Sequence, residues 1–534
     1  MNTTHPTDKS VLARPVWMAA WLLLCILLSA CALTDLTSAP VSENTPARPP
    51  ASTAPANPTT ATGRPTDQPT LTPEPLRGQA ASPFSADPQI AFAQKFDGKD
   101  AYEFTRFLTS AELAGRKAGA AGGDKAADYI AQAFKAAGLK PVGDNNTYFQ
   151  SLTLPFIDLG EPPTLKILNA DGSVKRAFQF RADFRESGSW LSSDGHAEGP
   201  LVFLGRAGNR DMDLAGDLKG KIALILPPPN TPVQRLMDAV SARGITGLIA
   251  ITGSADGLKF KSSYIVGSQR AGETRALLVV SRAVADDLLS GSGATLRELE
   301  DKLNRDGAAF AATPNRVAMT MRLASLADRP TRNVIGVIAG SDPALANEVV
   351  MVGGHYDHVG ADPGGILFQG ANDNASGTAV VMALAAHFAQ NNIRLKRTIV
   401  FAAWTAEESG LVGSKYYVEH PIFPLKQTIA YINLDVVGAG EGQGLTVTND
   451  SPSLGDVARA SAKDLGIKTG GGGAGGGSDH ESFLEKGVRS TFFIWQNYGS
   501  IHTPDDTFDQ IDVNKLKATG QVAALTLLRL AQGQ

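Results

Sequence analysis

Seven histidine and carboxylate side chains in the second half of the chain are of the types that bind divalent metal ions. They are His355, Asp357, Asp373, Glu407, Glu408, Asp435 and His502. Several of them come soon after short apolar runs, where gathered carboxylates repel one another unless a cation offsets their charge. Imidazole together with carboxylate suits zinc or another borderline divalent ion. The residue types therefore predict a divalent metal site.

Two positions indicate how such a site would be organised. Two metal ions need more ligands than one, and a carboxylate shared between them reduces their repulsion. Asp373 suits that role because its loop opens a predicted helix. Glu407 and Glu408 are adjacent, and consecutive side chains in extended backbone point opposite ways. One of the two can therefore bind metal while the other takes a proton from a water molecule, whose pKa a metal lowers to about 7.

These residues follow the strands of a predicted α/β domain. Apolar runs predict strands at 333–338, 349–352, 398–403, 428–434 and 491–494, with helices at 377–391, 453–465 and 514–530. Two amphipathic helices between 101 and 138 and a strand at 148–156 are predicted to precede them. Buried strands separated by helices imply a mostly parallel or mixed central sheet flanked by helices. Because ligands bind beyond the carboxyl ends of such strands, the site is expected at that edge.

The region 159–326 has a different pattern. Its short apolar runs at 201–204, 222–226, 248–251 and 277–280 are divided by Gly, Pro and Asp, with a possible helix at 233–242. This predicts a smaller β-rich α+β domain, built of short strands with one or two helices, inserted into the first. The stretch 220–225, followed by that helix and by 244–249, resembles a protease-associated domain. It contains no cluster of acid, base and metal ligand, so we expect a lid or substrate-access role.

The N-terminus has the pattern of an export signal. Lys9 and Arg14 precede an apolar run from 16 to 30, which is shorter than the ~20 residues that span a bilayer. The run ends in Leu28-Ser29-Ala30-Cys31, which resembles a bacterial lipobox and predicts lipidation of Cys31. An ordinary signal peptide or an uncleaved anchor is the alternative. We expect an exported lipoprotein, with outer-membrane sorting favoured by the residues after Cys31.

The predicted order of domains follows from these patterns. Residues 1–30 form the signal peptide, and 31–94 form a disordered tether rich in Pro, Thr and Ala. The metal-binding domain comprises 95–158 and 327–534, and 159–326 is the inserted domain. The net charge of −4 argues against nucleic acid as a partner. The two cysteines, Cys25 and Cys31, leave no thiol for a disulfide or a metal site in the folded body.

Five segments in order resemble the M28 family of co-catalytic di-zinc aminopeptidases, interruption by a protease-associated domain included. They are 353–357, 370–377, 405–408, 433–435 and 501–507. The resemblance covers about 95–534 and implies two zinc ions and peptide or protein substrates. The roles it implies are zinc binding by His355 and Asp435 at one ion and by Glu408 and His502 at the other, bridging by Asp373, proton transfer by Glu407, and orientation of His355 by Asp357. In the implied reaction, activated water attacks the first peptide bond while the acidic rim holds the free α-amino group.

Some neighbouring residues depart from this pattern or stay open. Several family members carry a tyrosine before the last histidine as an oxyanion donor, but this chain has Ile501, and Tyr498 could substitute. His358 lies three residues after His355, and such a His-x-x-His pair could bind metal, but the family pattern does not use His358. The triplet 478–480 either lies near the substrate pocket or caps the helix that begins near Glu481.

Two further sets of residues are assigned to supporting positions. Asp505 and Asp506 are expected to fix the loop that carries His502. His387 is predicted in a helix and His420 in a loop, away from the metal.

Other functions compete with the aminopeptidase. Two come from the same fold, a di-zinc carboxypeptidase and a single-zinc glutaminyl cyclase. A carboxypeptidase needs a basic residue for the substrate's C-terminal carboxylate, and Arg489 is the nearest candidate. From another class, the chain could be a surface-tethered binding protein with a degenerate site. The complete pair Glu407-Glu408 favours hydrolysis.

Overall fold

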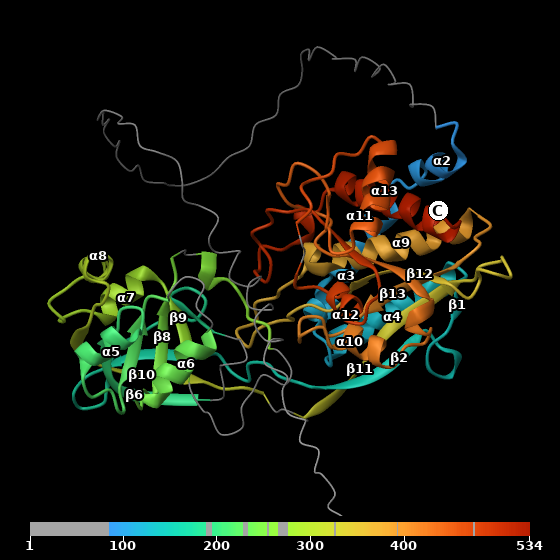
Figure 1. The fold of residues 1–534 in the computed structure, drawn as a ribbon. Coiled ribbons are helices and arrows are strands. Elements are labelled where there is room, and N and C mark those ends of the chain that lie inside the picture. Colours follow the sequence, from blue (N-terminus) through green and yellow to red (C-terminus); the bar gives the residue numbers. More distant parts are fainter. Residues whose placement is uncertain are drawn as a thin grey trace, which may run out of the picture.

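The computed structural model describes residues 85–187, 195–227, 233–253, 256–264, 276–324, 327–391, 393–473 and 476–534. The predicted signal peptide, Cys31 and most of the predicted tether lie outside these residues. The described residues form two eight-stranded mixed sheets in two bodies (Figure 1). Among the same residues, no helix has the length and hydropathy to cross a membrane.

The first sheet has the order β1-β11-β13-β12-β14-β16-β15, and β2 pairs with β11. Its four central strands, β13, β12, β14 and β16, are parallel. The outer strands pair in antiparallel fashion. The strands are β1 (Lys140–Pro141), β2 (Phe149–Pro155), β11 (Asp328–Ile338), β12 (Val349–His355), β13 (Thr398–Trp404), β14 (Thr428–Leu434), β15 (Thr446–Val447) and β16 (Ser490–Ile494).

Helices cover both faces of this sheet because its central strands are apolar on both sides. On β12, Val350 and Val352 pack into a core with one set of helices, and Val349 and Met351 pack into a second core on the other face. The first set is α2 (Pro88–Gln94), α3 (Lys99–Leu108), α4 (Ala121–Ala136), α9 (Gly377–Gln390), α11 (Pro452–Asp464) and α13 (Val513–Ala531). The second set is α10 (Val412–Glu419) and α12 (His480–Leu484). The predicted α/β class with a mixed, helix-flanked sheet is confirmed.

The second sheet has the order β4-β3-β10-β6-β7-β8-β9-β5, and its strands β6 to β9 are parallel. Its strands are β3 (Thr164–Leu168), β4 (Val174–Ala177), β5 (Phe184–Glu186), β6 (Gly195–Phe203), β7 (Ile222–Ile225), β8 (Gly247–Ile251), β9 (Leu277–Val280) and β10 (Ala311–Met321). Its helices are α5 (Asn209–Ala215), α6 (Val233–Ala242), α7 (Arg282–Leu288) and α8 (Leu296–Asp306). The described residues thus hold more helix here than the one or two helices that the sequence predicts.

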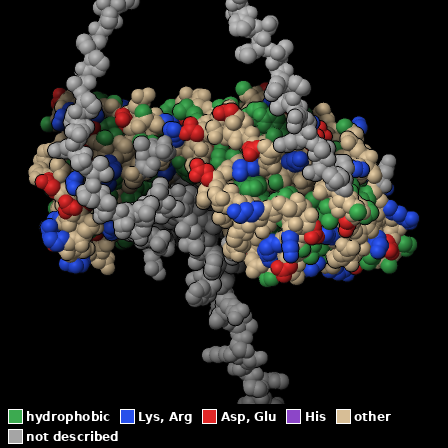
Figure 2. Space-filling model, turned by 90° about the horizontal axis from the view of Figure 1, so that it is seen from above, with side chains coloured by type: hydrophobic (Ala, Val, Ile, Leu, Met, Phe, Trp, Pro, Cys, Tyr) green, Lys and Arg blue, Asp and Glu red, His purple; other side chains and the backbone are tan. Residues whose placement is uncertain are grey.

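The second sheet is an insertion between two paired strands of the first. Pro155 at the end of β2 lies opposite Asp328 at the start of β11, and Leu159 bridges to Leu323 just beyond them. The chain therefore leaves and returns side by side. We call the part built on the first sheet the main domain and the part built on the second sheet the inserted domain. On the face drawn in Figure 2, acidic and basic side chains are interspersed over both domains.

Candidate metal centre

The predicted site residues meet at the carboxyl-terminal edge of the parallel strands. His355 is the last residue of β12, Asp435 directly follows β14, and Glu407 and Glu408 follow β13. Asp373 lies in the helical turn η4 (Ala371–Ser376) that leads into α9, and His502 lies in the loop after β16. Parallel strands bring their ends to one edge, so residues up to 147 positions apart become neighbours. 

One group of side chains surrounds the end of β12. The Nε2 atom of His355 is 3.4 Å from Asp373 Oδ1 and 3.4 Å from Asp435 Oδ1. Glu407 Oε2 is 3.9 Å from the same nitrogen. The Oδ1 atom of Asp435 is buried and has no hydrogen-bond partner among the described residues. We call His355, Asp373 and Asp435 the first group.

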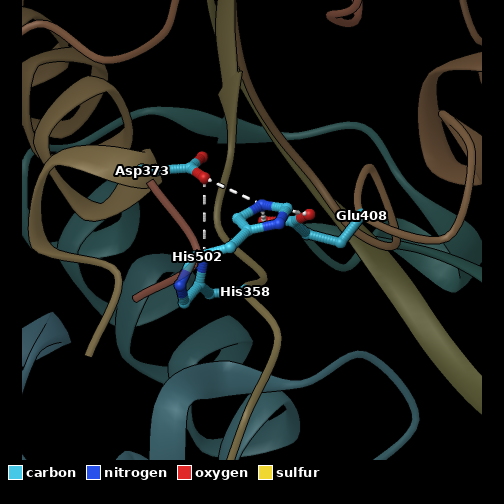
Figure 3. Close-up of side chains that lie close together, drawn as sticks. All are labelled: His358, Asp373, Glu408 and His502. Carbon is cyan, nitrogen blue, oxygen red and sulfur yellow. Dashed lines mark hydrogen bonds and ion pairs between the residues drawn. The ribbon is translucent and has the colours of Figure 1, made fainter. Parts of the chain in front are cut away.

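A second group lies on the other side of Asp373. The Nε2 atom of His502 is 3.1 Å from Asp373 Oδ2 and 2.8 Å from Glu408 Oε2. His358 joins it, with Nδ1 3.0 Å from Glu408 Oε1, and the four side chains point toward one another (Figure 3). We call His358, Asp373, Glu408 and His502 the second group. Asp373 therefore presents one carboxylate oxygen to each group.

The donor sets of both groups fit zinc. Ligands about 2.0–2.1 Å from one tetrahedral zinc ion lie about 3.3 Å from one another. Within the two groups, the separations given above run from 2.8 Å to 3.4 Å. A buried carboxylate oxygen without a hydrogen-bond donor, such as Asp435 Oδ1 among the described residues, is explained by a cation. Imidazole and carboxylate are ligands that zinc accepts.

Asp357 holds the adjacent glutamates in place. Its Oδ1 accepts the backbone N–H of Glu407 at 3.1 Å, and its Oδ2 accepts that of Glu408 at 3.4 Å. The Nδ1 atom of His355 is 3.2 Å from the backbone oxygen of Asp357 but 3.7 Å from its carboxylate. The backbone carbonyl of Asp357, and not its carboxylate, is thus the nearer partner that orients His355. Asp357 is a positioning residue for both strand ends.

The adjacent glutamates have opposite electrostatic environments. Burial raises the pKa of Glu407, and the negative charges of Glu408, Asp479 and Asp435 raise it further against the opposing effect of His355. Burial also acts to raise the pKa of Glu408, but the charge of His502 and hydrogen bonds from His358 and His502 lower it below its ordinary value. Neighbouring carboxyls with opposed pKa shifts are typical of an acid–base residue beside a ligand.

The backbone is in the left-handed region beside three of these side chains. Ala406, which precedes Glu407, has φ 55°, Val436 after Asp435 has φ 55°, and His502 has φ 57°. Such conformations cost a non-glycine residue of order 1–3 kcal/mol each and persist where the surroundings enforce them. The turns that present the ligands are therefore held by their surroundings and not by local preference.

Arg116 is a buried residue behind the site that sequence reasoning missed. Its guanidinium donates to the carbonyls of Tyr356, Leu108, Gln369 and Gly370 at 2.6–2.7 Å. Burial lowers its pKa to about 10, against the charges of Asp506 and other nearby carboxylates. One side chain thereby ties the loop after β12 to the loop before Asp373. No local pattern in the sequence marks this role.

Asp505 and Asp506 have separate contacts. Asp506 accepts the backbone N–H groups of Asn372 and Asp373 at 2.8 Å and 3.1 Å, so it fixes the loop of the shared carboxylate. Tyr498 donates its hydroxyl hydrogen to Asp506 at 2.7 Å. The hydroxyl that could have served as the oxyanion donor is therefore used by Asp506. Asp505 instead forms an ion pair with Lys259 of the inserted domain.

The triplet 478–480 supports the first group. Ser478 donates its hydroxyl to Asp435 Oδ2 at 2.7 Å and accepts from Asn433. Asp479 precedes α12 but makes no side-chain capping hydrogen bond. Burial raises its pKa to about 7. His480 stacks on Phe492. The contacts therefore favour a place beside the first group over helix capping.

The inserted domain reaches the second group. Ser263 donates its hydroxyl to Glu408 Oε2 at 2.9 Å, and the Phe260 ring lies 5.3 Å from the His502 ring. Buried Lys261 donates through Nζ to the carbonyls of Val359 and Ala361, at 2.7 Å and 2.8 Å. The sequence predicted an access role for this domain but not these contacts, which join residues about 100 to 240 positions apart.

His387 and His420 lie away from both groups. The Nε2 atom of His387 is 3.0 Å from the carbonyl oxygen of Phe92, and exposed His420 stacks on Tyr416. Arg489 donates to the carbonyl of Ile429, at the amino-terminal ends of β14 and β16. It therefore lies at the edge of the sheet opposite the metal groups.

Comparison with known proteins finds a family match over the segment that carries both groups. Residues 333–527 match the model of peptidase family M28. The chain is 32% identical over 215 residues to aminopeptidase YwaD of Bacillus subtilis, which covers 38% of this chain and 45% of the relative. It is 40% identical over 126 residues to leucine aminopeptidase 2 of Trichophyton equinum, 23% of either protein. The chain thus matches less than half the length of these relatives.

Solved structures share the fold over a larger part of the chain. An aminopeptidase from Aneurinibacillus sp. strain AM-1 covers 83% of this chain and 95% of its own, with 24% identity and a TM-score of 0.59. A peptidase M28 precursor from Shewanella amazonensis covers 84% and 96%, with 22% identity and a TM-score of 0.61. These similarities extend across both sheets.

Proposed function

Residues 333–527 match the model of peptidase family M28, and we propose that the chain belongs to this family and is a zinc-dependent aminopeptidase acting on peptides. The observation that carries the proposal is Asp373, whose two oxygens face two separate groups of buried histidine and carboxylate. A carboxylate shared in this way supports two zinc ions per chain. The names of the related aminopeptidases support the class of reaction.

The side chains divide the work in the proposed reaction. His355, Asp373 and Asp435 would hold one zinc ion, and Asp373, Glu408 and His502 would hold the other. When bound, zinc would act as a Lewis acid and lower the pKa of a water molecule bound to it to about 7. Glu407, whose carboxylate lies 3.9 Å from His355 Nε2, would take a proton from the attacking water and pass it to the departing amine. The carboxyl group of Asp479, whose negative charge raises the pKa of Glu407, would suit the positively charged α-amino group of the substrate.

Competing functions of the same fold are less well supported. A carboxypeptidase needs a cation for the substrate carboxylate, but Arg489 lies at the other end of the strands and the Arg116 guanidinium is used by four carbonyls. A single-zinc cyclase does not need a carboxylate shared between two groups. A degenerate binding protein does not need the complete set of donors together with the Glu407 carboxylate.

Cell attachment and access are further parts of the proposal. We propose that Cys31 is lipidated and holds the enzyme on the bacterial outer membrane, through the part of the predicted tether that precedes α2, since α2 itself packs into the core of the main domain. We also propose that the inserted domain is a protease-associated domain that controls access to the site. The contact from Ser263 to Glu408 supports the second statement.

Hydrolysis of aminoacyl chromogenic substrates tests the proposed activity. We expect turnover of substrates with a free α-amino group, loss of turnover on chelation, and recovery on addition of zinc. Turnover confined to N-acylated peptides with a free carboxylate contradicts the aminopeptidase and supports a carboxypeptidase. For the anchor, Cys31→Ser should move the protein from the membrane fraction to the soluble fraction, and its retention on the membrane contradicts lipidation at Cys31.

A further inference from the structure

We propose that His358 is a fourth protein ligand of the second metal position, so that the two positions differ in kind. The second position is then closed by four side chains, and the first is held by three and keeps a place for water. This inference rests on the proposed zinc enzyme and assigns a residue that the family pattern leaves out.

The contacts of His358 repeat those of His502. The Nδ1 atom of His358 is 3.0 Å from Glu408 Oε1 and 3.8 Å from Asp373 Oδ2. The Nε2 atom of His502 is 2.9 Å from the same glutamate oxygen and 3.1 Å from the same aspartate oxygen. One ligand atom from each member of the second group lies within 4.8 Å of the others (Figure 3). Both histidines therefore present a nitrogen to the same point.

Packing holds the ring of His358 in this orientation. The residue is 1% exposed, and its ring meets that of His502 edge-on at 5.3 Å between centroids. At Gly370, a Cβ atom would come within 2.4 Å of the His358 ring, so the backbone of that loop lies directly against it. Arg116 in turn donates to the carbonyl of Gly370. Packing thus fixes the plane of the imidazole, with Nδ1 facing Glu408.

The charge of the second group calls for a cation at that point. Asp373 and Glu408 are both buried, and among the described residues their ion-pair partners are histidines. Two neutral imidazoles leave two carboxylate charges uncompensated, and a divalent ion balances them. The same four side chains then satisfy a tetrahedral ion without water.

A difference in function between the two positions follows. Sites with four protein ligands are typically structural, whereas catalytic zinc sites keep an open position for water or substrate. The first group has three ligands and lies beside Glu407, whose Oε2 is 3.9 Å from His355 Nε2. We therefore expect water to be activated at the first position, while the second binds its ion more tightly and holds the shared Asp373.

Zinc competition against a chromophoric chelator tests the assignment in the full chain, purified in detergent. The wild-type chain should bind two ions with unequal affinity. His358→Ala should weaken the tighter ion by about 100-fold or more, above the range for residues that only orient a ligand. With Co²⁺ in place of zinc, the variant should also show altered visible absorption bands. His420→Ala, at an exposed histidine outside both groups, is the matched control and should bind as wild type does.

His358→Asn distinguishes a role of His358 as a metal ligand from a role as a hydrogen-bond donor only, because the amide of the new asparagine can still donate to Glu408. As a ligand loss, it should weaken the tighter ion as much as His358→Ala does, with circular dichroism unchanged. Wild-type affinity in the Asn variant would overturn the assignment, as would wild-type affinity in the Ala variant. If the wild-type chain itself bound no metal, the proposed zinc enzyme would fail, and the role of His358 with it.

Discussion

The two sheets of this protein share a centre of four parallel strands but differ in the charged side chains at the carboxyl ends of those strands. Each has four neighbouring parallel strands, β13-β12-β14-β16 in the main domain and β6-β7-β8-β9 in the inserted domain. By geometry alone, either carboxyl-terminal edge could hold a ligand. In the main domain, buried histidines and carboxylates gather there.

In the inserted domain, a cavity of about 780 Å³ lies at the corresponding strand ends. Its charged lining residues are Arg206, Arg282, Asp286, Arg297, Glu300 and Asp301. Arg282 pairs with Glu300, and the two side chains are 44% and 24% exposed. The acidic and basic side chains of this cavity thus neutralise one another, and they are partly exposed to solvent. The carboxyl ends of parallel strands therefore show where a ligand could bind. Buried carboxylates that, among the described residues, are not paired with lysine or arginine indicate that the ligand in the main domain is a cation.

The largest effect on stability should come from the buried guanidinium. Arg116→Met leaves four carbonyls unpaired behind the metal groups, so we expect a loss of about 3–5 kcal/mol in the free energy of unfolding. Arg282→Met, at the edge of the inserted domain, removes a partly exposed ion pair and should cost about 0–1 kcal/mol. Urea denaturation of both variants measures the contrast. Equal losses of unfolding free energy in the two variants would contradict the expectation that the buried arginine contributes more to stability than the partly exposed one.

The largest effect on catalysis should come from the carboxylate that faces the first group. Glu407→Gln should lower kcat by at least ~100-fold, as expected for loss of a general base, with metal content unchanged. Glu300→Gln at the other edge is the matched control and should leave kcat as it is. Retention of most activity by purified Glu407→Gln would refute its role.

The buried contact between the two domains should be sensitive to pH. Lys261→Met leaves the carbonyls of Val359 and Ala361 without their donor, which should cost about 1–3 kcal/mol of stability. Burial lowers the pKa of Lys261 to about 8 from an ordinary value of 10.5. Between those values the unfolded chain binds more protons, so the stability of the wild type should rise relative to Lys261→Met with increasing pH. Urea denaturation at pH 7 and pH 9.5 measures this difference, and a decrease would contradict it.

The smallest effect should come from an exposed contact between the same domains. Lys259 and Asp505 are 44% and 55% exposed and lie 2.6 Å apart. Lys259→Met should change the free energy of unfolding by less than about 1 kcal/mol, and by less still in high salt. Thermal denaturation at two salt concentrations measures it. A loss as large as that of Lys261→Met would show that the exposed contact also holds the domains together.

Much of the main domain could be predicted because its strands are apolar on both faces. The strand predicted at 428–434 matches β14, and the helix predicted at 377–391 differs from α9 by one residue. The two-residue strands β1 and β15 are too short to carry a periodic pattern. Helix α8 has a usable signal that the prediction did not apply, a capping box of Thr295 and Glu298 followed by leucines at helical spacing.

The site was predictable where chemistry and strand ends coincide. His355, Glu407 and Asp435 come at or just after apolar runs, and a family pattern adds His502. The spacing of His355 and His358 marked His358 as a possible ligand, but the family pattern set it aside. Arg116 and Ser263 could not be found in that way, because their contacts depend on packing between distant segments. Arg116, for example, reaches carbonyls 240 to 254 positions away as well as a local one. Such contacts leave no local pattern in a single sequence.

Metal content measured together with activity tests the central claim most directly. Purified full-length protein that hydrolyses aminoacyl substrates should contain two zinc ions per chain by elemental analysis, and activity should fall as the ions are withdrawn. Active protein without a stoichiometric transition metal would contradict an enzyme built on two cations at this edge of the first sheet.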